Sequence, residues 1–330
     1  MIEKKDRLAL VDAANRAPSV HNIQPARYRF EDERTITLLE DPRRRLFVGD
    51  PKGSDNQKSL GAALEGLALA LSERGIGLET APAASEHEAV RITLATGAAR
   101  DPLAKFAETR ASWRGAFAPK VDAGHAALAR LAEACPDLHI IEAPDAIAEL
   151  AKFYDEVSLE VVRAPAYRAE LLSWMRLSKR RPEYARDGLN AEHMALSPFE
   201  AFAAGVVLGG AFTALDGIGL AGPLMAEASK VKSAAGIALF HRPAAEPELE
   251  TGRRFYRVWL EIERAGLALC PMSVLADVPH AAARLLHEAG LGSNRKLVTA
   301  FRIGRRPSNA HTAPRARLPA AELIDQEMSG

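Results

Sequence analysis

Two stretches far apart in the chain share one apolar helical pattern, and this repetition constrains the fold more than any other feature. The first runs from Ser59 to Arg74 and the second from Thr251 to Ala265. They align without a gap, and the aligned pairs are Gly61 with Gly252, Leu64 with Phe255, Leu67 with Val258, Leu69 with Leu260, Gly75 with Gly266 and Leu78 with Leu269. A helix that is apolar on most sides is buried on most sides. We therefore expect two nearly all-apolar helices that pack on each other.

The sequence after each helix also repeats. Each helix is followed by a strand that ends in glycine, Val90 to Gly97 in the first copy and Leu297 to Gly304 in the second. We therefore expect two related α/β units, residues 1–100 and 101–330, fused as the two subunits of a dimer would pair. The alternative is that helix, glycine and strand follow one another so commonly that the match has no meaning.

Composition argues against several classes of partner. With 330 residues, of which 48% are hydrophobic and 26% charged, the chain is long enough for one large or two modest domains. Lysine plus arginine and aspartate plus glutamate both number 43, so no net charge favours nucleic acid or an anionic membrane. The charged N-terminus, the lack of a long apolar stretch and the presence of only two cysteines predict a cytoplasmic protein. Neither the cysteines nor the nine histidines have the spacing of a metal site.

The loop at residues 17–25 has the composition of a binding loop. It follows a short helical pattern and precedes an alternating run, Tyr28 to Leu39, that predicts a strand. Two prolines restrict its backbone, and its short polar side chains can bond a flat polar heterocycle. The same composition also suits a plain turn. His21 within the loop can serve a ligand or the loop itself.

Arginines at alternate positions occur in two places. Arg110, Ser112 and Arg114 lie on one side of an extended backbone, and so do Arg315 and Arg317 near the C-terminus. Guanidinium and hydroxyl groups on one side of a strand suit a phosphate. Such arginines are also common on a solvated surface, but two pairs, each at a boundary of its unit, favour an anion site.

Together these segments resemble the nitroreductase family of FMN-dependent oxidoreductases, in the branch where two subunits are fused into one chain. The resemblance covers most of the chain apart from about residues 125–200. Residues 17–25 are similar to the family's loop that reaches across the dimer interface to the flavin ring. Residues 110–117 resemble its opening motif and residues 315–319 its closing basic pair, both of which hold the FMN phosphate. Residues 267–273 resemble the segment whose backbone passes the flavin ring.

The resemblance implies a set of FMN contacts and a fold. The implied cofactor-binding residues are Pro18, Ser19, Val20, Asn22, Gln24, Arg110, Ser112, Arg114, Pro271, Met272, Ser273, Arg315 and Arg317. The implied fold is α+β, a nitroreductase-like three-layer α-β-α arrangement in which each unit has a central mixed sheet with helices on both faces. Its two units meet at a central helical interface. Because each unit keeps only part of the motif set, we expect one complete FMN site, made by both units. The family usually has tryptophan after Gln-Pro, and Ala26 stands there in this chain.

The resemblance also implies an activity. The family passes reducing equivalents from NAD(P)H through FMN to an electron-poor small molecule such as a nitroarene or quinone, in a ping-pong cycle. The chemistry takes place on the flavin, so no catalytic side chain and no metal is expected. The fusion makes a monomeric pseudo-dimer sufficient, although a homodimer is also compatible with it.

The insertion at residues 151–205 leaves a second function open. It contains an amphipathic stretch, then Arg181-Pro182 and Asp187-Gly188, which break a helix. With Trp174, Met175 and Tyr184 it is a candidate lid, or else extra helical packing. A lid over the cofactor would make the protein a flavin store or sensor with little reductase activity. A flavin-free scaffold that kept only the fold is the third alternative.

Overall fold

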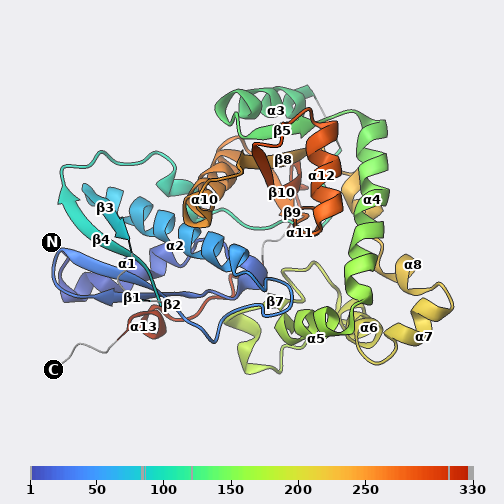
Figure 1. The fold of residues 1–330 in the computed structure, drawn as a ribbon, viewed down its shortest axis with the longest axis horizontal. Coiled ribbons are helices and arrows are strands. Elements are labelled where there is room, and N and C mark those ends of the chain that lie inside the picture. Colours follow the sequence, from blue (N-terminus) through green and yellow to red (C-terminus); the bar gives the residue numbers. More distant parts are fainter. Residues whose placement is uncertain (1, 83–84, 86, 120–121, 311–312, 326–330) are drawn as a thin grey trace.

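The computed structural model describes residues 2–82, 85, 87–119, 122–310 and 313–325, and it contains two four-stranded sheets (Figure 1). The strands of the first sheet are β1 (Ala26–Phe30), β2 (Thr35–Glu40), β3 (Ile76–Pro82) and β4 (Glu88–Thr96), in the spatial order β1-β2-β4-β3. Those of the second are β5 (Leu138–Ile141), β8 (Gly236–Pro243), β9 (Ala268–Pro271) and β10 (Arg295–Gly304), in the order β5-β8-β10-β9. The two sheets therefore have the same topology.

Helices connect the strands in a matching order. The longer ones are α1 (Lys4–Ala14), α2 (Ser54–Ser72), α3 (Asp122–Ala134), α4 (Pro144–Arg163), α5 (Pro165–Trp174), α6 (Pro198–Leu208), α10 (Glu248–Arg264) and α12 (Pro279–Glu288). The shorter ones are α7 (Phe212–Gly217), α8 (Ala221–Met225), α9 (Ala228–Lys232), α11 (Val274–Asp277), α13 (Ala320–Leu323), η1 (Val20–Asn22), η2 (Ala104–Ala107) and η3 (Pro182–Ala185). Helix α2 follows the second strand of its sheet and α10 follows the second strand of the other. Among the described residues, every helix is too short or too polar to span a bilayer.

The two sheets differ in how they are covered. One cluster of buried side chains joins α1 and α2 to a single face of the first sheet. On β4, Val90, Ile92 and Leu94 are buried while Arg91, Thr93 and Ala95 are exposed, so the other face of this strand meets solvent. The second sheet is covered on both faces, by α4, α11 and α12 on one side and by α3 and α10 on the other. The second unit thus has the expected three layers, whereas in the first unit α1 and α2 pack on the same face of the sheet.

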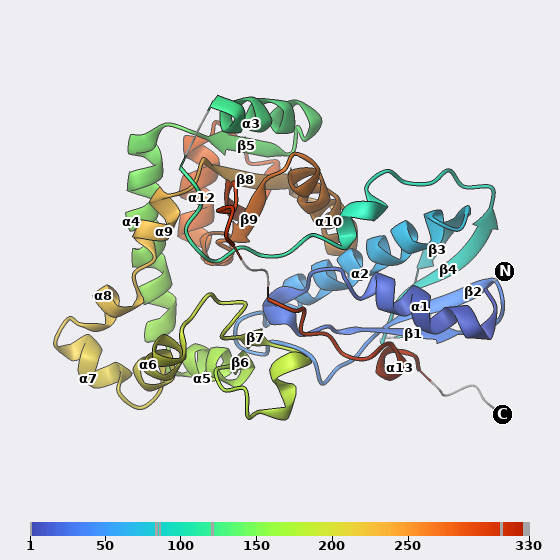
Figure 2. The ribbon, with the colours of Figure 1, turned by 180° about the vertical axis from the view of Figure 1, so that it is seen from behind.

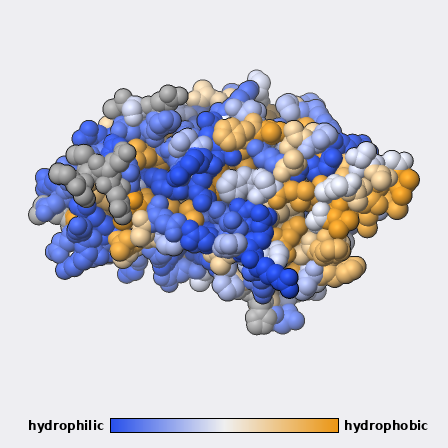
Figure 3. Space-filling model, turned by 90° about the horizontal axis from the view of Figure 1, so that it is seen from below, coloured by the Kyte–Doolittle hydropathy of each residue, from blue (hydrophilic) through white to orange (hydrophobic). Residues whose placement is uncertain are grey.

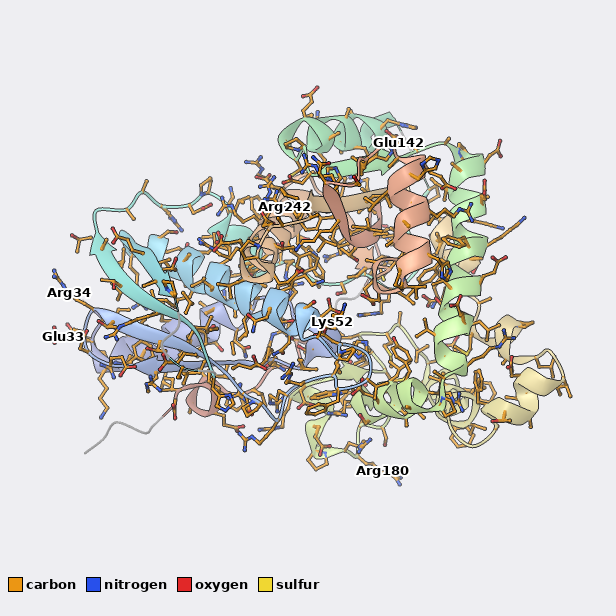
Figure 4. The ribbon with its side chains drawn as sticks, viewed as in Figure 1. Glu33, Arg34, Lys52, Glu142, Arg180 and Arg242 are labelled. Carbon is orange, nitrogen blue, oxygen red and sulfur yellow. The ribbon has the colours of Figure 1, made fainter. Side chains whose placement is uncertain are left out.

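The named strands do not form the expected mixed sheets. All neighbours within both four-stranded sheets are antiparallel. Among the described residues, parallel pairing is confined to the two-residue strands β6 (Met175–Arg176) and β7 (Leu189–Asn190) and to two isolated bridges at the sheet edges. The stretch Tyr28 to Leu39, expected as one strand, is a hairpin instead. Its turn carries Glu33 and Arg34, which project at the end of the molecule (Figure 4).

Helices α2 and α10 cross at the centre of the molecule, as the repeated pattern predicts (Figure 1). A Cβ atom on Gly61 would lie 1.9 Å from the Leu249 carbonyl oxygen, and one on Gly252 would lie 2.0 Å from the Lys58 carbonyl oxygen. The aligned glycines thus bring the two helix backbones into direct contact, each against the other helix. Helix α10 is less apolar than expected, because Arg253 and Arg257 on it donate to Glu65, which is buried on α2.

Each half of the chain ends in a segment that crosses to the other half. After β4 the chain passes to the second sheet, where Ser112 forms a parallel bridge with Leu269 of β9. After β10 the chain returns to the first sheet, where Ile324 forms a parallel bridge with Tyr28 of β1. Figure 2 shows this C-terminal segment running beside β1 to α13. The exchange places the arginines of both segments between the two sheets.

The glycine contacts at the helix crossing can be tested by substitution. Gly61→Ala or Gly252→Ala inserts a methyl group where a backbone oxygen already lies, so the helices must separate. We expect a loss of about 1–3 kcal/mol or more in the free energy of unfolding, measured by denaturant titration. Gly217→Ala is the matched control, because its added methyl group meets open space. Unchanged stability in both central variants would contradict the close crossing.

Candidate functional site

A cavity of about 330 Å³ lies between the two halves of the molecule. Its walls come from the loop at residues 17–25, the start of α2, the crossing segment after η2, helices α4 and α10, strands β9 and β10, and the C-terminal segment. This volume is within the range of small-molecule sites in proteins. Distant parts of the sequence therefore contribute to the walls of the same cavity.

Most residues predicted from the sequence line this cavity. They are Pro18, Ser19, Val20, Asn22, Arg110, Ser112, Arg114, Pro271, Ser273, Arg315 and Arg317. Two of the predicted residues, Gln24 and Met272, do not line it.

Gln24 supports the site without facing it. Its side-chain nitrogen donates to the carbonyl oxygens of Asn22 and Arg186, and its side-chain oxygen accepts from Asn15 and from the Leu318 backbone. Both donor hydrogens and both acceptor positions of the amide are thus used by the protein. In this structure the Gln24 side chain joins the loop to the C-terminal segment and does not line the cavity.

Met272 is buried behind the cavity. Its side chain belongs to the core between the second sheet and helices α4, α11 and α12. Its backbone N–H donates to the carbonyl oxygen of Ala300 at 2.7 Å. Pro271 and Ser273 line the cavity on either side of it, whereas the Met272 side chain is in the core and its N–H is used by Ala300.

The loop at residues 17–25 has an unusual backbone. His21, Asn22 and Gln24 all have positive φ angles, of 41°, 56° and 52°. Such angles are uncommon for residues other than glycine and persist only where surrounding contacts impose them. The Ser19 hydroxyl accepts from the Gln24 N–H at 3.0 Å, and the Asn22 side chain donates to the carbonyl oxygens of Gly188 and Ala316. The loop is therefore held in one conformation by the C-terminal segment and by the insertion.

Arg110 and Arg315 give one end of the cavity its charge. Arg110 is buried, its guanidinium lies 4.5 Å above the ring of Trp259, and its Nε has no hydrogen-bond partner among the residues that the structure describes. One terminal nitrogen of Arg315 donates to the carbonyl oxygens of Ala107, Glu108 and Arg110. Burial, together with the charge of Arg110, lowers the pKa of Arg315 to about 10. Both guanidinium groups keep donors that no protein group in the described part of the chain uses.

Arg317 has a different role from these two. Its Nε donates to the carbonyl oxygen of Asn15 at 2.6 Å, and one terminal nitrogen donates to the Asn22 side-chain oxygen at 2.5 Å. The remaining donors bond the carbonyl oxygens of residues 16, 17 and 316. Burial and the neighbouring Arg110 and Arg315 lower its pKa to about 9. Arg317 thus lines the cavity and adds positive charge, but its N–H groups position the loop rather than await a ligand.

Arg114, the remaining predicted arginine, has no carboxylate partner among the described residues. Arg114 donates to the carbonyl oxygen of His193 at 3.3 Å. Within the described residues, none of the four arginines at positions 110, 114, 315 and 317 forms a salt bridge. Partly buried guanidinium groups without a carboxylate favour an anionic ligand, since buried charges in proteins are normally paired.

Arg302, which the sequence analysis did not identify, fixes the segment that carries Arg114. It is fully buried on β10, and its terminal nitrogens donate to the carbonyl oxygens of Arg114 at 2.7 Å and Gly115 at 2.8 Å. Its position inside the apolar strand from Leu297 to Gly304 could have identified it from the sequence, because a lone arginine there must find buried acceptors.

The opposite end of the cavity has mixed charge. Lys58 pairs with Asp55 at 2.6 Å at the start of α2, and the Ser59 hydroxyl accepts from the Val20 N–H at 3.0 Å. Asp55, Lys58 and Ser59 all line the cavity, as do Tyr154 and Thr299. Sequence reasoning missed these residues because they lie in helices and strands with no motif of their own. In the described part of the chain, no three histidine, cysteine or acidic side chains come together as a metal would require.

Two histidines in the cavity wall are held neutral. Burial lowers the pKa of His21 to about 4, with Arg114 adding to the effect and Asp55 opposing it. Burial and the charges of Arg114 and Arg317 lower the pKa of His193 to about 4. The Nδ1 atom of His21 is buried without a partner, whereas Nδ1 of His193 lies 2.7 Å from the Asn190 side-chain oxygen. Both imidazoles therefore offer neutral hydrogen-bonding groups near neutral pH.

The insertion covers part of the cavity, but with other residues than expected. Gly188, Leu189 and His193 line the cavity, whereas Trp174, Met175 and Tyr184 do not. Met175 and Tyr184 are buried in small clusters within the insertion. The backbone N–H of Arg317 donates to the Ala185 carbonyl oxygen at 3.2 Å. The buried carboxylate of Asp187 accepts from the side chains of Arg44 and Arg176. The insertion is thus bonded to both the loop side and the C-terminal side of the cavity.

The neutral histidines give stability a predictable pH dependence. Unfolded histidine has a pKa of about 6.5, so below that pH the unfolded chain takes up protons that the folded chain takes up only near pH 4. The contribution of these two histidines to the free energy of unfolding is fully present above pH 6.5 and is lost as the pH falls toward 4. Denaturant titrations at pH 7.5 and 5 should differ more for the natural chain than for a His21→Gln, His193→Gln variant. An equal difference would contradict the lowered pKa values.

Comparison with known proteins gives distant structural matches. No protein-family model and no curated protein matches the chain. One solved structure that matches is the FMN and NADPH-dependent nitroreductase NfnB from sphigopyxis sp. strain HMH, with 20% identity, a TM-score of 0.37, and coverage of 68% of this chain and 98% of that one. Another is the FMN-dependent nitroreductase NfnB from Mycobacterium smegmatis in complex with NADPH, with 19% identity, a TM-score of 0.36, and coverage of 63% and 90%. A nitroreductase with bound FMN from Bacteroides fragilis matches with 12% identity, a TM-score of 0.36, and coverage of 64% and 92%.

Proposed function

We propose that this protein is an FMN-dependent oxidoreductase with one cofactor site per chain. The observation that carries the proposal is the group of arginines at one end of the cavity, with unused donors and no carboxylate partner within the described residues. A dianionic phosphate group satisfies such a cluster, and a mononucleotide attaches that phosphate to a ring system that the remainder of the cavity can enclose. The residues present therefore fit FMN.

The proposal assigns a role to each wall of the cavity. Arg110, Arg114 and Arg315 hold the phosphate with their unused N–H groups. The Ser112 hydroxyl, on the same segment, is available to the ribityl chain. Pro18, Val20 and Pro271 supply apolar surface to the ring, while the imidazole of His21 offers a neutral partner for a polar atom.

Bound FMN would supply the redox chemistry, taking a hydride from NAD(P)H and giving it to an electron-poor acceptor such as a nitroarene or quinone. The protein's own part is to bind, orient and exclude water. Arg317 holds Asn22 and the carbonyl oxygens of the loop, so the loop conformation does not depend on a ligand. The positive charge of the arginines favours anionic forms of a bound group.

We propose two fused units, residues 1–100 and 101–330, that share one site. The single site follows from an asymmetry in the repeated topology. In the first unit α1 and β1 are separated by residues 15–25, which include the loop that lines the cavity. At the equivalent place in the second unit, only residues 135–137 separate α3 from β5. The second unit therefore has no loop with which to build a second equivalent site.

A flavin store is the second candidate, and the bonds of the insertion favour it. Residues 185–188 bond the loop and the C-terminal segment, and buried Asp187 joins Arg176 of the insertion to Arg44 of the first unit. A cover fixed in this way would slow the entry of NAD(P)H.

Substitution of Arg110 tests the phosphate assignment. Arg110→Ala removes a charged donor from a buried site, and we expect about tenfold to hundredfold weaker FMN binding, measured by quenching of flavin fluorescence. Arg100→Ala is the matched control, because Arg100 is exposed on the same crossing segment and pairs with Glu73. Equal affinity of the two variants would place the phosphate elsewhere.

Anaerobic reduction separates the two candidate functions. An oxidoreductase with bound FMN loses its yellow colour rapidly when NADPH or NADH is added without oxygen, whereas a covered store keeps it. Asp187→Asn removes the charge that holds the insertion to Arg44 and Arg176, so it should speed bleaching if the insertion limits access. Bleaching that is absent from both the natural chain and the variant would count against the oxidoreductase.

A further inference from the structure

An exposed apolar surface lies at the end of the insertion and on the residues that follow it, at the end of the molecule away from the first sheet. Figure 3 shows apolar residues gathered at this end, where Figure 1 places α6, α7 and α8. We call it the insertion surface, and its members are Phe199, Phe202 and Val206 of α6, Ile218 and Leu220 between α7 and α8, and Leu224 of α8. The exposed fractions of Phe199, Phe202 and Ile218 are 78%, 71% and 70%.

The insertion surface is larger than the apolar patches of an ordinary monomer. Phe199, Phe202 and Val206 are spaced by three and four residues, so they form one stripe on α6. The six residues together expose on the order of 600–700 Å². A standard protein interface buries about 800 Å² on each partner. The surface thus has the area that one side of a stable dimer needs.

Burying this surface would leave almost no charge without a partner. Between residues 198 and 226 the only charged side chains are Glu200 and Asp216. Glu200 completes the cap of α6 with Ser197, and Asp216 pairs with Arg163 at 3.0 Å. Since unpaired buried charge is the main cost of closing an interface, this segment is suited to burial against another apolar surface.

Charge also favours a protein partner over a lipid surface. Helices that lie on membranes carry lysine or arginine on their polar face, and residues 198–226 contain neither. The nearest basic turn, Lys179 to Arg181, pairs Lys179 with Glu192 and Arg181 with Glu183. Arg180 projects from it into solvent (Figure 4).

We propose that the insertion surface is the contact between two copies of this chain, related by a two-fold axis. A two-fold contact uses the same patch on both copies, so an apolar, nearly uncharged surface is complementary to itself. The insertion surface rests on a small cluster of buried side chains that includes Met175 and Phe212. Met175 also belongs to β6, which pairs with β7 at the cavity wall. Pairing of two chains would therefore also steady the part of the insertion that covers the cavity.

Analytical ultracentrifugation of the whole protein tests this proposal. At about 10 μM we expect a dimer for the natural chain and a monomer for Phe199→Asp, Phe202→Asp. Because both side chains project into solvent, the variant should keep the circular dichroism spectrum of the natural chain. Leu8→Asp is the matched control, since Leu8 is 50% exposed on α1 at the other end of the molecule, and it should remain dimeric.

Three results would overturn the proposal. The first is a natural chain that stays monomeric at about 100 μM, and the second is a dimer that persists in the double variant. The third is a monomer that sediments with vesicles of phosphatidylcholine and phosphatidylglycerol and loses this binding in the double variant, which would make the surface a lipid contact. None of these results depends on whether the cavity holds FMN.

Discussion

The backbone contact between α2 and α10 is the constraint on which the remaining structure depends. Gly61 and Gly252 each meet a carbonyl group of the opposite helix, so the two sheets are held at one fixed separation. Any larger side chain at either position would push the helices apart. At this separation the segment after each sheet reaches the other sheet, and the cavity forms where the two crossing segments pass the helix pair.

The cavity draws its charge from these crossing segments. Arg110 and Arg114 come from the segment that leaves the first sheet, and Arg315 and Arg317 from the segment that leaves the second. All four line the same cavity, but their hydrogen bonds differ. Arg317 is committed to the loop at residues 17–25, which leaves Arg110, Arg114 and Arg315 with donors for a ligand. One guanidinium group thus shapes the site, and the other three keep donors that the described residues leave unused.

The sequence predicted the helix pair, the loop and the arginine pairs because each depends on local pattern. It did not reveal which donors remain free, since the bonds of Arg317 and Gln24 join residues about 300 positions apart. His193 was missed because the insertion has no motif, and only the folded chain brings it to Arg114. The alternation of Val90 and Ile92 with Arg91 and Thr93 does predict a strand with one solvent-facing side, which the expectation of helices on both faces of the first sheet overlooked.

The central claim is that one anionic flavin occupies the cavity between the two halves of each chain. The most direct measurement is the visible absorption spectrum of the purified protein after incubation with FMN and removal of the unbound fraction, with the flavin quantified against protein. The account predicts one FMN per chain, since only the first unit has the loop that completes a site. A colourless protein, or two FMN per chain, would contradict it.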